Sequence, residues 1–438
     1  MTLAELLPTL GRCLPGRLDP GVWPDDCARR PGGDIALSGV PLTRLARDHG
    51  TPAYVLDVAT IRGRCREYRA LDAEIAYAAK AFLCRRMAAL VAEEGLSLDV
   101  CSAGELATAR AAGFPAERIL LHGNAKPDHE LRLAADAGVG RVVVDSPDEI
   151  DRIPGPQDVL VRVTPDIDAH THRAVATGIE DQKFGLSLTS GQAAEAVRRI
   201  LARPDLRLLG LHCHLGSQLS DVAAHVEAVR RLVGFSADVA VRHGVLFPQL
   251  NLGGGHAVRY RARDAGYDLA AFAARVPEVL RFECRKHGLP VPRLTLEPGR
   301  ALVARAGLTL YRVVAVKRGG ARTFVAVDGG FSDNPRPALY DARYDVRLFG
   351  RTSTAPERRA AVVGRHCEAG DVLVPDALLP DDVRPGDLLV VPCTGAYHHS
   401  MASTCNRVGR PPVIAVEDGR AEPWVRRETD QDLLSRDA

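Results

Sequence analysis

With 438 residues, the chain is too long for one small core and long enough for a large barrel with a second domain. Its composition is 46% hydrophobic and 26% charged, and a net charge of +2 without runs of like charge argues against a nucleic-acid or membrane partner. The ten cysteines include no Cys-x-x-Cys pair, which argues against a zinc site or disulfide framework. With no signal-like segment or membrane-length apolar run, we expect a soluble, cytoplasmic protein.

The first half of the chain alternates between strand-like and helix-like segments. Residues 1–50 are expected to be irregular apart from a helix at Pro41–His49, and a short strand at Ala53–Leu56 precedes a helical stretch at Val58–Leu71. Eight apolar, β-branched segments then alternate with helix-like stretches, which predicts a (β/α)₈ TIM-like barrel. The predicted barrel strands are Ile75–Ala79, Leu96–Val100, Ile119–His122, Arg141–Asp145, Val159–Val163, Leu208–His212, Gln249–Leu252 and Leu294–Glu297.

After Gly307 the pattern changes to strands separated by turns, with hardly any helix. This predicts a second, mostly antiparallel β-sandwich or β-barrel domain. The Tyr54 strand is expected to join it, so the predicted domains are a barrel over residues 58–306 and a β domain made of residues 1–57 and 307–438. The predicted strands of the second domain are Thr309–Val316, Thr323–Asp328, Ala360–Gly364, Asp387–Val391 and Val413–Val416.

Lys80 stands just after the first predicted barrel strand. Only five of the 57 basic residues are lysine, so a lysine at a strand end is unusual in this chain. An arginine stays protonated, whereas a lysine amine can lose its proton and attack a carbonyl to form a Schiff base. A strand-end lysine is still most often a surface charge, so the interpretation depends on the other strand ends.

Polar or glycine residues follow nearly every predicted barrel strand. Active sites of such barrels lie at the carboxyl ends of the strands, so these residues are expected to converge on one pocket. They are Lys80, Asp99, His122-Gly123-Asn124, Asp145, Arg162, His212 with His214, Gly253–Gly255, and Glu297-Pro298-Gly299-Arg300. Asp99 and Arg162 could equally be structural.

Two of these strand ends indicate a phosphorylated ring cofactor. Gly253–Gly255 lets backbone N–H groups approach an anion, and Ser217 and Arg300 lie at neighbouring strand ends, which favours a phosphate site over a tight turn. A carboxylate such as Glu297 facing a pyridine nitrogen keeps that nitrogen protonated and makes the ring an electron sink. The competing interpretation is a structural Glu297–Arg300 pair.

The His212-Cys213-His214 segment has two interpretations. A His-x-His pair on a barrel strand can chelate a metal ion, because residues i and i+2 share a face. Metal sites of that kind take further His and Asp ligands from later strands, where this chain has glycines and Glu-Pro-Gly-Arg. We therefore expect no metal, a His214 ring that stacks on a flat cofactor, and His212 as a core residue.

Six ordered motifs, spread from about Val40 to Asp432, resemble those of the fold-type III pyridoxal-phosphate-dependent decarboxylases. Within them the diaminopimelate decarboxylase family is most similar, because its Arg-Pro-Ala-Leu-Tyr signature stands at Arg336–Tyr340. The six motifs are Tyr77–Ala81, His214–Gln218, Gly253–Gly255, Glu297–Arg300, Cys367–Asp371 and Gly395–Tyr397.

The resemblance implies a role for each matching residue. Lys80 would bind pyridoxal 5'-phosphate as an aldimine, His214 would stack on its ring, and Glu297 would bind its pyridine nitrogen. Six residues would hold the phosphate or line its site: Ser217, Gly254, Gly255, Gly299, Arg300 and Tyr397. Arg300, Arg336 and Tyr340 would bind the distal carboxylate of the substrate, and Glu368 would bind its distal ammonium. Tyr397 would also contact the substrate. Cys367 would donate the proton that replaces the departing carboxylate.

The reaction implied by the resemblance is decarboxylation of meso-2,6-diaminopimelate to L-lysine and CO₂. In this family the Cys367 and Glu368 positions come from the partner subunit, so a homodimer with shared active sites is implied. The chain departs from the family pattern at His256-Ala257, His398-His399 and Cys405-Asn406. Two alternatives therefore stay open: a related decarboxylase of another amino acid, including a carrier-linked one, and an inactive regulatory homologue, against which intact Lys80 and Cys367 count.

Overall fold

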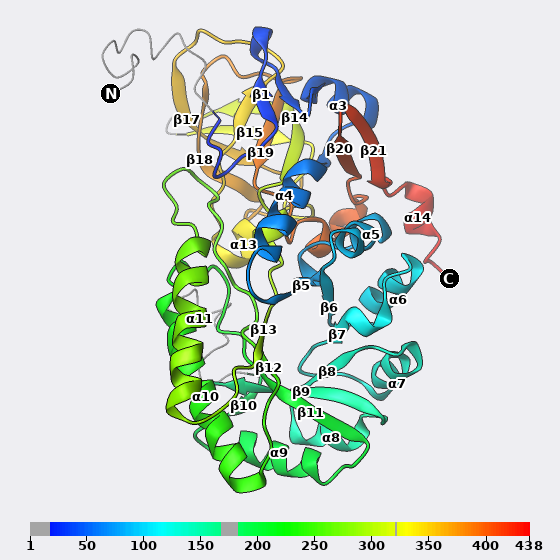
Figure 1. Ribbon diagram of the computed structural model, residues 1–438. Helices are drawn as coiled ribbons and strands as arrows, with labels where there is room; N and C mark the ends of the chain where they lie inside the picture. Colours follow the sequence, from blue (N-terminus) through cyan, green and yellow to red (C-terminus); the bar gives the residue numbers. More distant parts are fainter. Residues whose placement is uncertain (1–17, 168–182, 320–321) are drawn as a thin grey trace, which may run out of the picture. The chain divides into compact units, whose positions relative to one another are not determined.

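The computed structural model describes residues 18–167, 183–319 and 322–438, so the first 17 residues of the expected irregular N-terminal segment lie outside it. The chain divides into two compact units (Figure 1). The barrel unit comprises residues 62–258 and 265–302, and the β unit comprises the described residues within 1–61, 259–264 and 303–438. None of the described helices is long and apolar enough to cross a membrane.

The barrel unit is built on eight parallel strands that close on themselves. The pairing of β9 with β8 and of β13 with β5 completes the ring, which confirms the predicted TIM-like barrel and all eight of its predicted strands. The strands are β5 (Glu74–Ala78), β6 (Ser97–Val100), β7 (Ile119–Leu121), β8 (Arg141–Val144), β9 (Gln157–Thr164), β11 (Leu206–His212), β12 (Gln249–Asn251) and β13 (Arg293–Leu296). The two-residue β10 (Leu186–Ser187) pairs with the end of β9.

Helices alternate with these strands and bury their apolar faces. In α9 (Gln192–Leu201) the buried residues Ala193, Ala196, Val197 and Ile200 follow the helical spacing i, i+3, i+4 and i+7. The other helical segments are α4 (Val58–Arg69), η2 (Ala79–Ala81), α5 (Arg85–Glu93), α6 (Ala103–Ala111), η3 (Ala116–Arg118), α7 (Asp128–Ala137), α8 (Pro147–Arg152), α10 (Ala223–His243), α11 (Leu269–Lys286) and α12 (Arg300–Val303).

The β unit contains a nine-stranded, mostly antiparallel sheet, which confirms the predicted fold of the second domain. As predicted, the Tyr54 strand, β4 (Ala53–Asp57), joins it, where it pairs with β14 and β20. The remaining strands are β14 (Gly307–Arg318), β15 (Thr323–Val327), β16 (Arg347–Phe349), β17 (Glu357–Val363), β18 (Val372–Pro380), β19 (Leu388–Pro392), β20 (Val413–Glu417) and β21 (Arg420–Val425). Three of them, β16, β18 and β21, were not among the predicted strands.

The expectation that residues up to 50 are irregular apart from one helix is wrong in part. The helix is present as α3 (Leu42–His49), but before it a small antiparallel sheet forms from β1 (Cys27–Arg29), β2 (Ile35–Leu37) and β3 (Val40–Pro41), with η1 (Pro31–Gly33) between the first two. The short helices of the β unit are α13 (Arg336–Tyr340), η5 (His399–Met401), η6 (Cys405–Arg407) and α14 (Asp430–Leu434).

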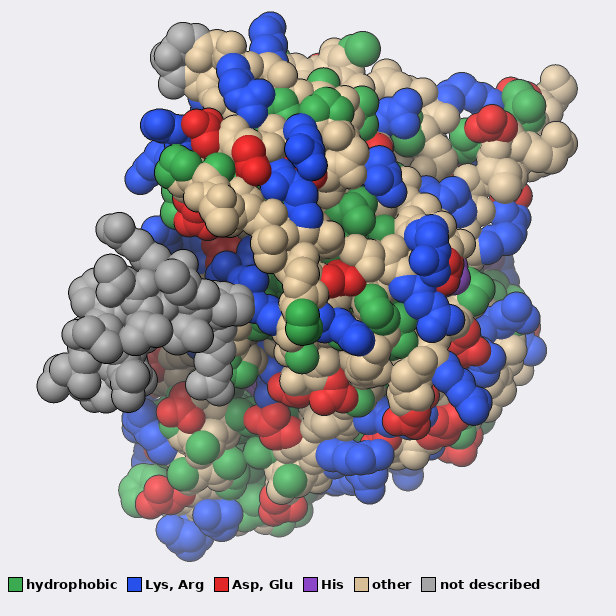
Figure 2. Space-filling model, turned by 90° about the horizontal axis from the view of Figure 1, so that it is seen from above, with side chains coloured by type: hydrophobic (Ala, Val, Ile, Leu, Met, Phe, Trp, Pro, Cys, Tyr) green, Lys and Arg blue, Asp and Glu red, His purple; other side chains and the backbone are tan. Residues whose placement is uncertain are grey.

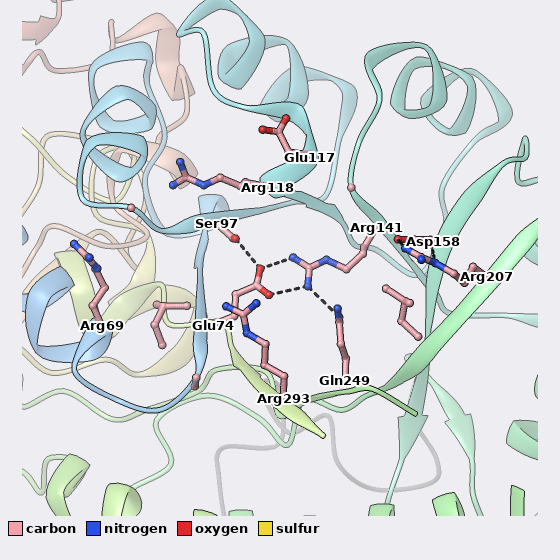
Figure 3. A pocket seen from close by; sticks show the side chains of 15 residues that line it. Arg69, Glu74, Ser97, Glu117, Arg118, Arg141, Asp158, Arg207, Gln249 and Arg293 are labelled. Atoms are coloured by element: carbon pink, nitrogen blue, oxygen red, sulfur yellow. Dashed lines mark hydrogen bonds and ion pairs between the residues drawn. The ribbon is translucent and has the colours of Figure 1, made fainter. Parts of the chain in front are cut away.

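A hollow of about 680 Å³ lies at the amino ends of the barrel strands (Figure 3). Lys80 follows the carboxyl end of β5, so it lies at the opposite end of the barrel. The floor of the hollow is an ion-paired network, in which Arg141 donates to Glu74 Oε2 at 2.9 Å and to Gln249 Oε1 at 3.0 Å, and Ser97 donates to Glu74 Oε1 at 2.7 Å. Because Glu74 and Arg141 satisfy each other, this network closes the bottom of the barrel rather than offering free reactive groups.

Positive and negative side chains are interspersed over the surface seen in Figure 2. That face carries no broad field of one sign, in keeping with the balanced charge of the sequence.

Candidate active site

Lys80 lies on the one-turn segment η2 that directly follows β5. The four residues before η2 are buried, whereas the Lys80 side chain is exposed at the strand end. The turn is held from two sides, because Tyr77 donates its hydroxyl to Phe82 O at 2.7 Å and Ala78 donates its N–H to Pro298 O at 3.2 Å. A Cβ on Gly299 would lie 3.0 Å from the Ala78 Cβ, so a larger residue would push the Pro298 turn away from the lysine segment by a few tenths of an ångström.

Glu297 follows β13 and is almost fully buried. Asn251 donates an amide hydrogen to Glu297 Oε1 at 2.7 Å, and His212 Nε2 lies 3.0 Å from Glu297 Oε2. Burial alone raises the pKa of Glu297, but the charge and hydrogen bond of His212, the charge of Lys80 and the Asn251 bond outweigh it, so the pKa is lowered. Glu297 is therefore a fixed, ionised carboxylate.

His212 is a core residue, as predicted, and in addition it contacts the predicted site residue Glu297. His212 is fully buried, but its Nε2 atom lies between Glu297 and His122, whose Nε2 is 3.2 Å away. The reactive atoms of these three residues lie within 4.8 Å of one another, a spacing that a metal ion could also use. Their position beside a glycine loop and Lys80 favours a hydrogen-bonded support for Glu297 instead.

His214 and the glycine loop contact each other directly. Gly254 donates its N–H to His214 Nδ1 at 3.1 Å, so the neutral ring carries its proton on Nε2. Burial, followed by the positive charges of Lys80 and Arg162, lowers the pKa of His214 well below its usual range, which keeps the ring neutral. A neutral imidazole held at one edge by a backbone N–H suits stacking on a flat ring.

Glycine is required in this loop by close approach of other backbone segments. A Cβ on Gly254 would overlap the Glu297 carbonyl oxygen, and a Cβ on Gly255 would overlap that of Gly216. Gly255 also has a φ of +96°, which strains other residues. The loop thus forms a cradle bounded by backbone atoms. Any side chain on Gly254 or Gly255 would fill this cradle.

Ser217 and Arg300 meet beside the same loop. Arg300 Nη2 donates to Ser217 Oγ at 2.8 Å, which brings together two of the residues predicted for the phosphate site. Gln218 ties their segment to the chain after the glycine loop, because it donates to Val258 O at 3.1 Å and accepts from Val258 N at 3.0 Å. The predicted structural Glu297–Arg300 pair is not among the ion pairs of the described residues.

His256, which departs from the family pattern, belongs to a buried aromatic cluster behind the glycine loop. Its ring stacks on Tyr267 at a centroid distance of 4.3 Å, and Tyr68 lies 2.8 Å from its Nδ1 atom. His225 packs edge-on against both His256 and Tyr267. The departure is thus accommodated by packing within the barrel unit.

Asp99 and Arg162, left open by the sequence, line the same end of the barrel. Arg162 pairs with Asp145 at 3.2 Å, which is a structural role. Burial and the nearby charge of Glu297 raise the pKa of Asp99 well above its usual range. Asp99 therefore holds its proton more tightly than an ordinary aspartate.

These residues fit pyridoxal phosphate. The backbone cradle with Ser217 and Arg300 suits a phosphate group, and Lys80 supplies an exposed primary amine at the same end of the barrel. The ionised Glu297 suits a protonated pyridine nitrogen. Asn251 and His212, which hold Glu297, are the functional neighbours that sequence reasoning missed.

In the β unit, Arg336 is buried at the start of α13 and surrounded by tyrosines. Its Nη1 atom donates to the hydroxyls of Tyr260 and, at 2.8 Å, Tyr344, and its guanidinium carbon lies 4.8 Å from the centre of the Tyr260 ring and 6.0 Å from that of Tyr397. Arg336 is therefore not a surface-loop residue. Tyr340, four residues later on the same helix, is half-buried.

Cys367 and Glu368 are both exposed, on the loop between β17 and β18. The residues around them are firmly anchored. His366 lies 2.8 Å from Ser332 Oγ and 3.0 Å from Asn406 Oδ1, and the Asp371 carboxylate accepts from the backbone N–H groups of His366 and Phe331. The loop thus presents the thiol and the carboxylate in a fixed position on the surface of the β unit.

Tyr397 is the remaining predicted site residue of the β unit, and two of its neighbours depart from the family pattern. Tyr397 has a φ of +62°, an uncommon conformation for a tyrosine and one often found at functional sites. His398, a departure from the family pattern, is buried, lies 2.9 Å from Ala396 O and packs edge-on against Tyr344. Cys405 is half-buried on η6.

Comparison with known proteins agrees with this geometry. The family model described as "Pyridoxal-dependent decarboxylase, pyridoxal binding domain" matches residues 58–304. A diaminopimelate decarboxylase of Actinosynnema pretiosum subsp. auranticum is 59% identical over 445 residues and covers 100% of both chains. A diaminopimelate decarboxylase of Mycobacterium tuberculosis is 48% identical over 95% of this chain and 98% of its own.

A solved structure shows the same similarity over nearly the whole fold. The crystal structure of diaminopimelate decarboxylase from M. jannaschii in complex with L-lysine superposes with a TM-score of 0.86 at 30% identity, covering 94% of this chain and 98% of that one. The chain therefore belongs to the pyridoxal-dependent decarboxylases and, within them, to the diaminopimelate decarboxylase family.

Proposed function

We propose that the chain catalyses pyridoxal-phosphate-dependent decarboxylation of meso-2,6-diaminopimelate to L-lysine and CO₂. The observation that carries this assignment is the environment of Arg336, whose guanidinium is buried among tyrosines and forms no ion pair with any carboxylate of the described residues. A buried cation without an anionic partner is costly, so the site is suited to an anionic group of the substrate.

Arg336 favours a substrate with a carboxylate at its distal end. A bidentate arginine–carboxylate contact supplies both energy and direction. A substrate whose distal end carries only an ammonium group would instead meet a like charge, so lysine and ornithine are poor candidates for decarboxylation. In this proposal Tyr340 and Arg300 also contact the distal carboxylate, Glu368 binds the distal ammonium, and Tyr397 lines the substrate site.

The barrel residues, together with Tyr397 of the β unit, would hold and orient the cofactor. Lys80 would bind it covalently through its amine, Ser217, Gly254, Gly255, Gly299, Arg300 and Tyr397 would contact the phosphate or line its site, and His214 would lie on the ring face. When bound, pyridoxal phosphate accepts the electrons of the carbon–carboxylate bond that breaks. Glu297, kept ionised by His212 and Asn251, would hold a proton on the pyridine nitrogen and so support that electron flow.

Cys367 would return a proton from its thiol to the carbon that loses the carboxylate. Its exposure and that of Glu368 support a homodimer in which both residues complete the partner's active site, because a proton donor needs shelter from water during the reaction.

We also propose residues 58–306 as the cofactor-binding domain and residues 1–57 with 307–438 as the second domain. No disulfide joins any two of the nine described cysteines, which supports a cytoplasmic location.

The assignment is tested with purified protein, pyridoxal phosphate and meso-diaminopimelate. We expect a visible absorbance band from the bound cofactor, together with release of lysine and CO₂. Lys80→Ala should lose both, whereas Lys317→Ala, which removes an exposed lysine of β14, should lose neither. A cofactor band without lysine release would move the chain to another amino-acid substrate, and the absence of a band would refute the cofactor role of Lys80.

Shared active sites are tested by mixing two inactive variants. Lys80→Ala lacks the cofactor lysine and Cys367→Ala lacks the proton donor, so a mixed dimer would contain one site with both residues intact. We expect the mixture to regain up to about a quarter of wild-type activity, because half of the dimers are mixed and each has one complete site. A mixture that stays inactive although the subunits exchange would contradict the proposal.

A further inference from the structure

We infer that Tyr260 and Tyr344 are positioning residues that determine specificity for a carboxylate-ended substrate by fixing the plane of the Arg336 guanidinium. The inference rests on the proposed function, in which Arg336 receives the distal carboxylate. Neither tyrosine belongs to a motif singled out in the sequence, and both lie within the β unit together with Arg336.

The two hydroxyls meet the same nitrogen. Arg336 Nη1 donates to Tyr260 and Tyr344, so both of its hydrogens are taken. The remaining donors, Nε and Nη2, have no partner among the residues that the structure describes. They form one edge of the planar guanidinium, and that edge matches the two oxygens of a carboxylate. The tyrosines therefore choose which edge of Arg336 is offered to the substrate.

The ring faces and the burial of the tyrosines complete this arrangement. Tyr260 and Tyr344 are 6% and 3% exposed, and their rings pack edge to face at a centroid distance of 5.1 Å. The guanidinium carbon lies 4.8 Å from the Tyr260 ring centre and 6.0 Å from that of Tyr344, within reach of cation–π attraction. On its other side Tyr344 packs against the buried His398, at a centroid distance of 5.4 Å.

Tyrosine suits this task better than a carboxylate would. A hydroxyl oxygen accepts a hydrogen bond without neutralising the cation, so Arg336 is held in place and keeps its full charge for the ligand. An Asp or Glu in either position would hold the guanidinium as firmly but would compete with the substrate carboxylate. The tyrosine pair thus separates orientation of the arginine from neutralisation of its charge.

The test uses Tyr260→Phe and Tyr344→Phe, which keep the rings and remove the acceptors. We expect each to raise KM for meso-diaminopimelate about tenfold, the size of one hydrogen bond to a charged group, with kcat within about twofold and an unchanged cofactor band. The matched control is Tyr54→Phe, because Tyr54 is equally buried in the β unit and donates its hydroxyl to the backbone carbonyl of Asp333 at 2.6 Å. Its KM should not change.

A binding measurement separates this inference from the proposed function. Pimelate has two carboxylates at the spacing of diaminopimelate but no amino group, so it cannot react. Calorimetric titration should show that wild-type protein binds pimelate, that Arg336→Met does not, and that both Phe variants bind about tenfold more weakly. Pimelate binding of this kind without turnover of diaminopimelate would refute the proposed function and support the tyrosine role.

Four results would overturn the inference. They are wild-type affinity in both Phe variants, a fall in kcat at constant KM, an equal loss in Tyr54→Phe, and absence of pimelate binding by wild-type protein. The cofactor band checks that each variant retains pyridoxal phosphate, and urea unfolding checks that the β unit, which contains both tyrosines, is folded.

Discussion

Replacing Gly254 by alanine tests whether the glycine loop holds the cofactor. The new Cβ would overlap the Glu297 carbonyl oxygen and lie 2.9 Å from its carbonyl carbon. Carbon atoms in favourable contact are about 3.5–4.0 Å apart, so the two backbone segments would have to separate by about 0.6–1.1 Å. Both segments carry functional groups: the Gly254 N–H bonds to His214, and Glu297 is the predicted partner of the pyridine nitrogen.

This displacement sets the expected size of the effect. Inserting a carbon into a tightly packed site costs about 1–3 kcal/mol of stability. A shift of about 1 Å in positioning groups is enough to lower a reaction rate about a hundredfold. We therefore expect Gly254→Ala to fold with modestly lower stability, to bind pyridoxal phosphate at least tenfold more weakly and to lose about 99% of its decarboxylase activity at saturating cofactor.

Cofactor affinity is measured by titrating the visible absorbance band, and stability by urea unfolding. The matched control is Gly234→Ala in the middle of α10, where an added Cβ meets no atom within 4 Å. There alanine should raise stability by about 0.5–1 kcal/mol through its higher helix propensity and leave cofactor binding unchanged. Wild-type cofactor affinity in Gly254→Ala would refute the role of the loop.

Three other predictions have defined outcomes. Asn251→Asp replaces the amide that donates to Glu297 at 2.7 Å by a second carboxylate, which raises the pKa of Glu297, so the acid limb of the kcat profile should move to higher pH. An unmoved limb would contradict this. Arg141→Leu removes the arginine that pairs with Glu74 and should lower the free energy of unfolding by about 3–5 kcal/mol. Adding Glu74→Gln should restore part of that loss, and no recovery would count against the ion-pair explanation. Burial raises the pKa of Asp333 from 3.8 to about 7, so the folded state holds this proton more tightly and stability should fall as pH rises between these values. Relative to Asp333→Asn, wild-type stability should drop by about 1.4 kcal/mol per pH unit in that window, whereas a constant difference would disprove it.

The barrel strands could be predicted because their signal is local. Each is a short apolar run bounded by turns, and buried parallel strands are apolar on both faces, as in Arg141–Val144. Strands β18 and β21 lack that signal, because each contains a proline, β18 mixes exposed with buried residues, and β21 has no buried residue. The small sheet at Cys27–Pro41 was missed because its strands are only two or three residues long.

The site residues also divide into those with a local sequence signal and those whose role depends on the folded structure. Lys80 could be identified because lysine is rare in this chain and because a strand-end amine has a specific chemistry. The role of His212 depends on Glu297, 85 residues later, and that proximity exists only once the barrel has closed. Tyr260 and Tyr344 belong to no motif, and Tyr260 meets Arg336 only because the fold brings together residues 76 positions apart.

The six residues Arg259–Asp264 restrict how the protein can be divided or recombined. They cluster with the β unit, although the residues before and after them cluster with the barrel, so the chain passes between the two units four times. A gene fragment for residues 62–302 would therefore encode a loop whose packing surface is missing. A chimaera of two relatives that exchanges the barrel as one block would take Tyr260 from one parent and Arg336 from the other. If the parents differ around this contact, the chimaera should fold but select its substrate poorly.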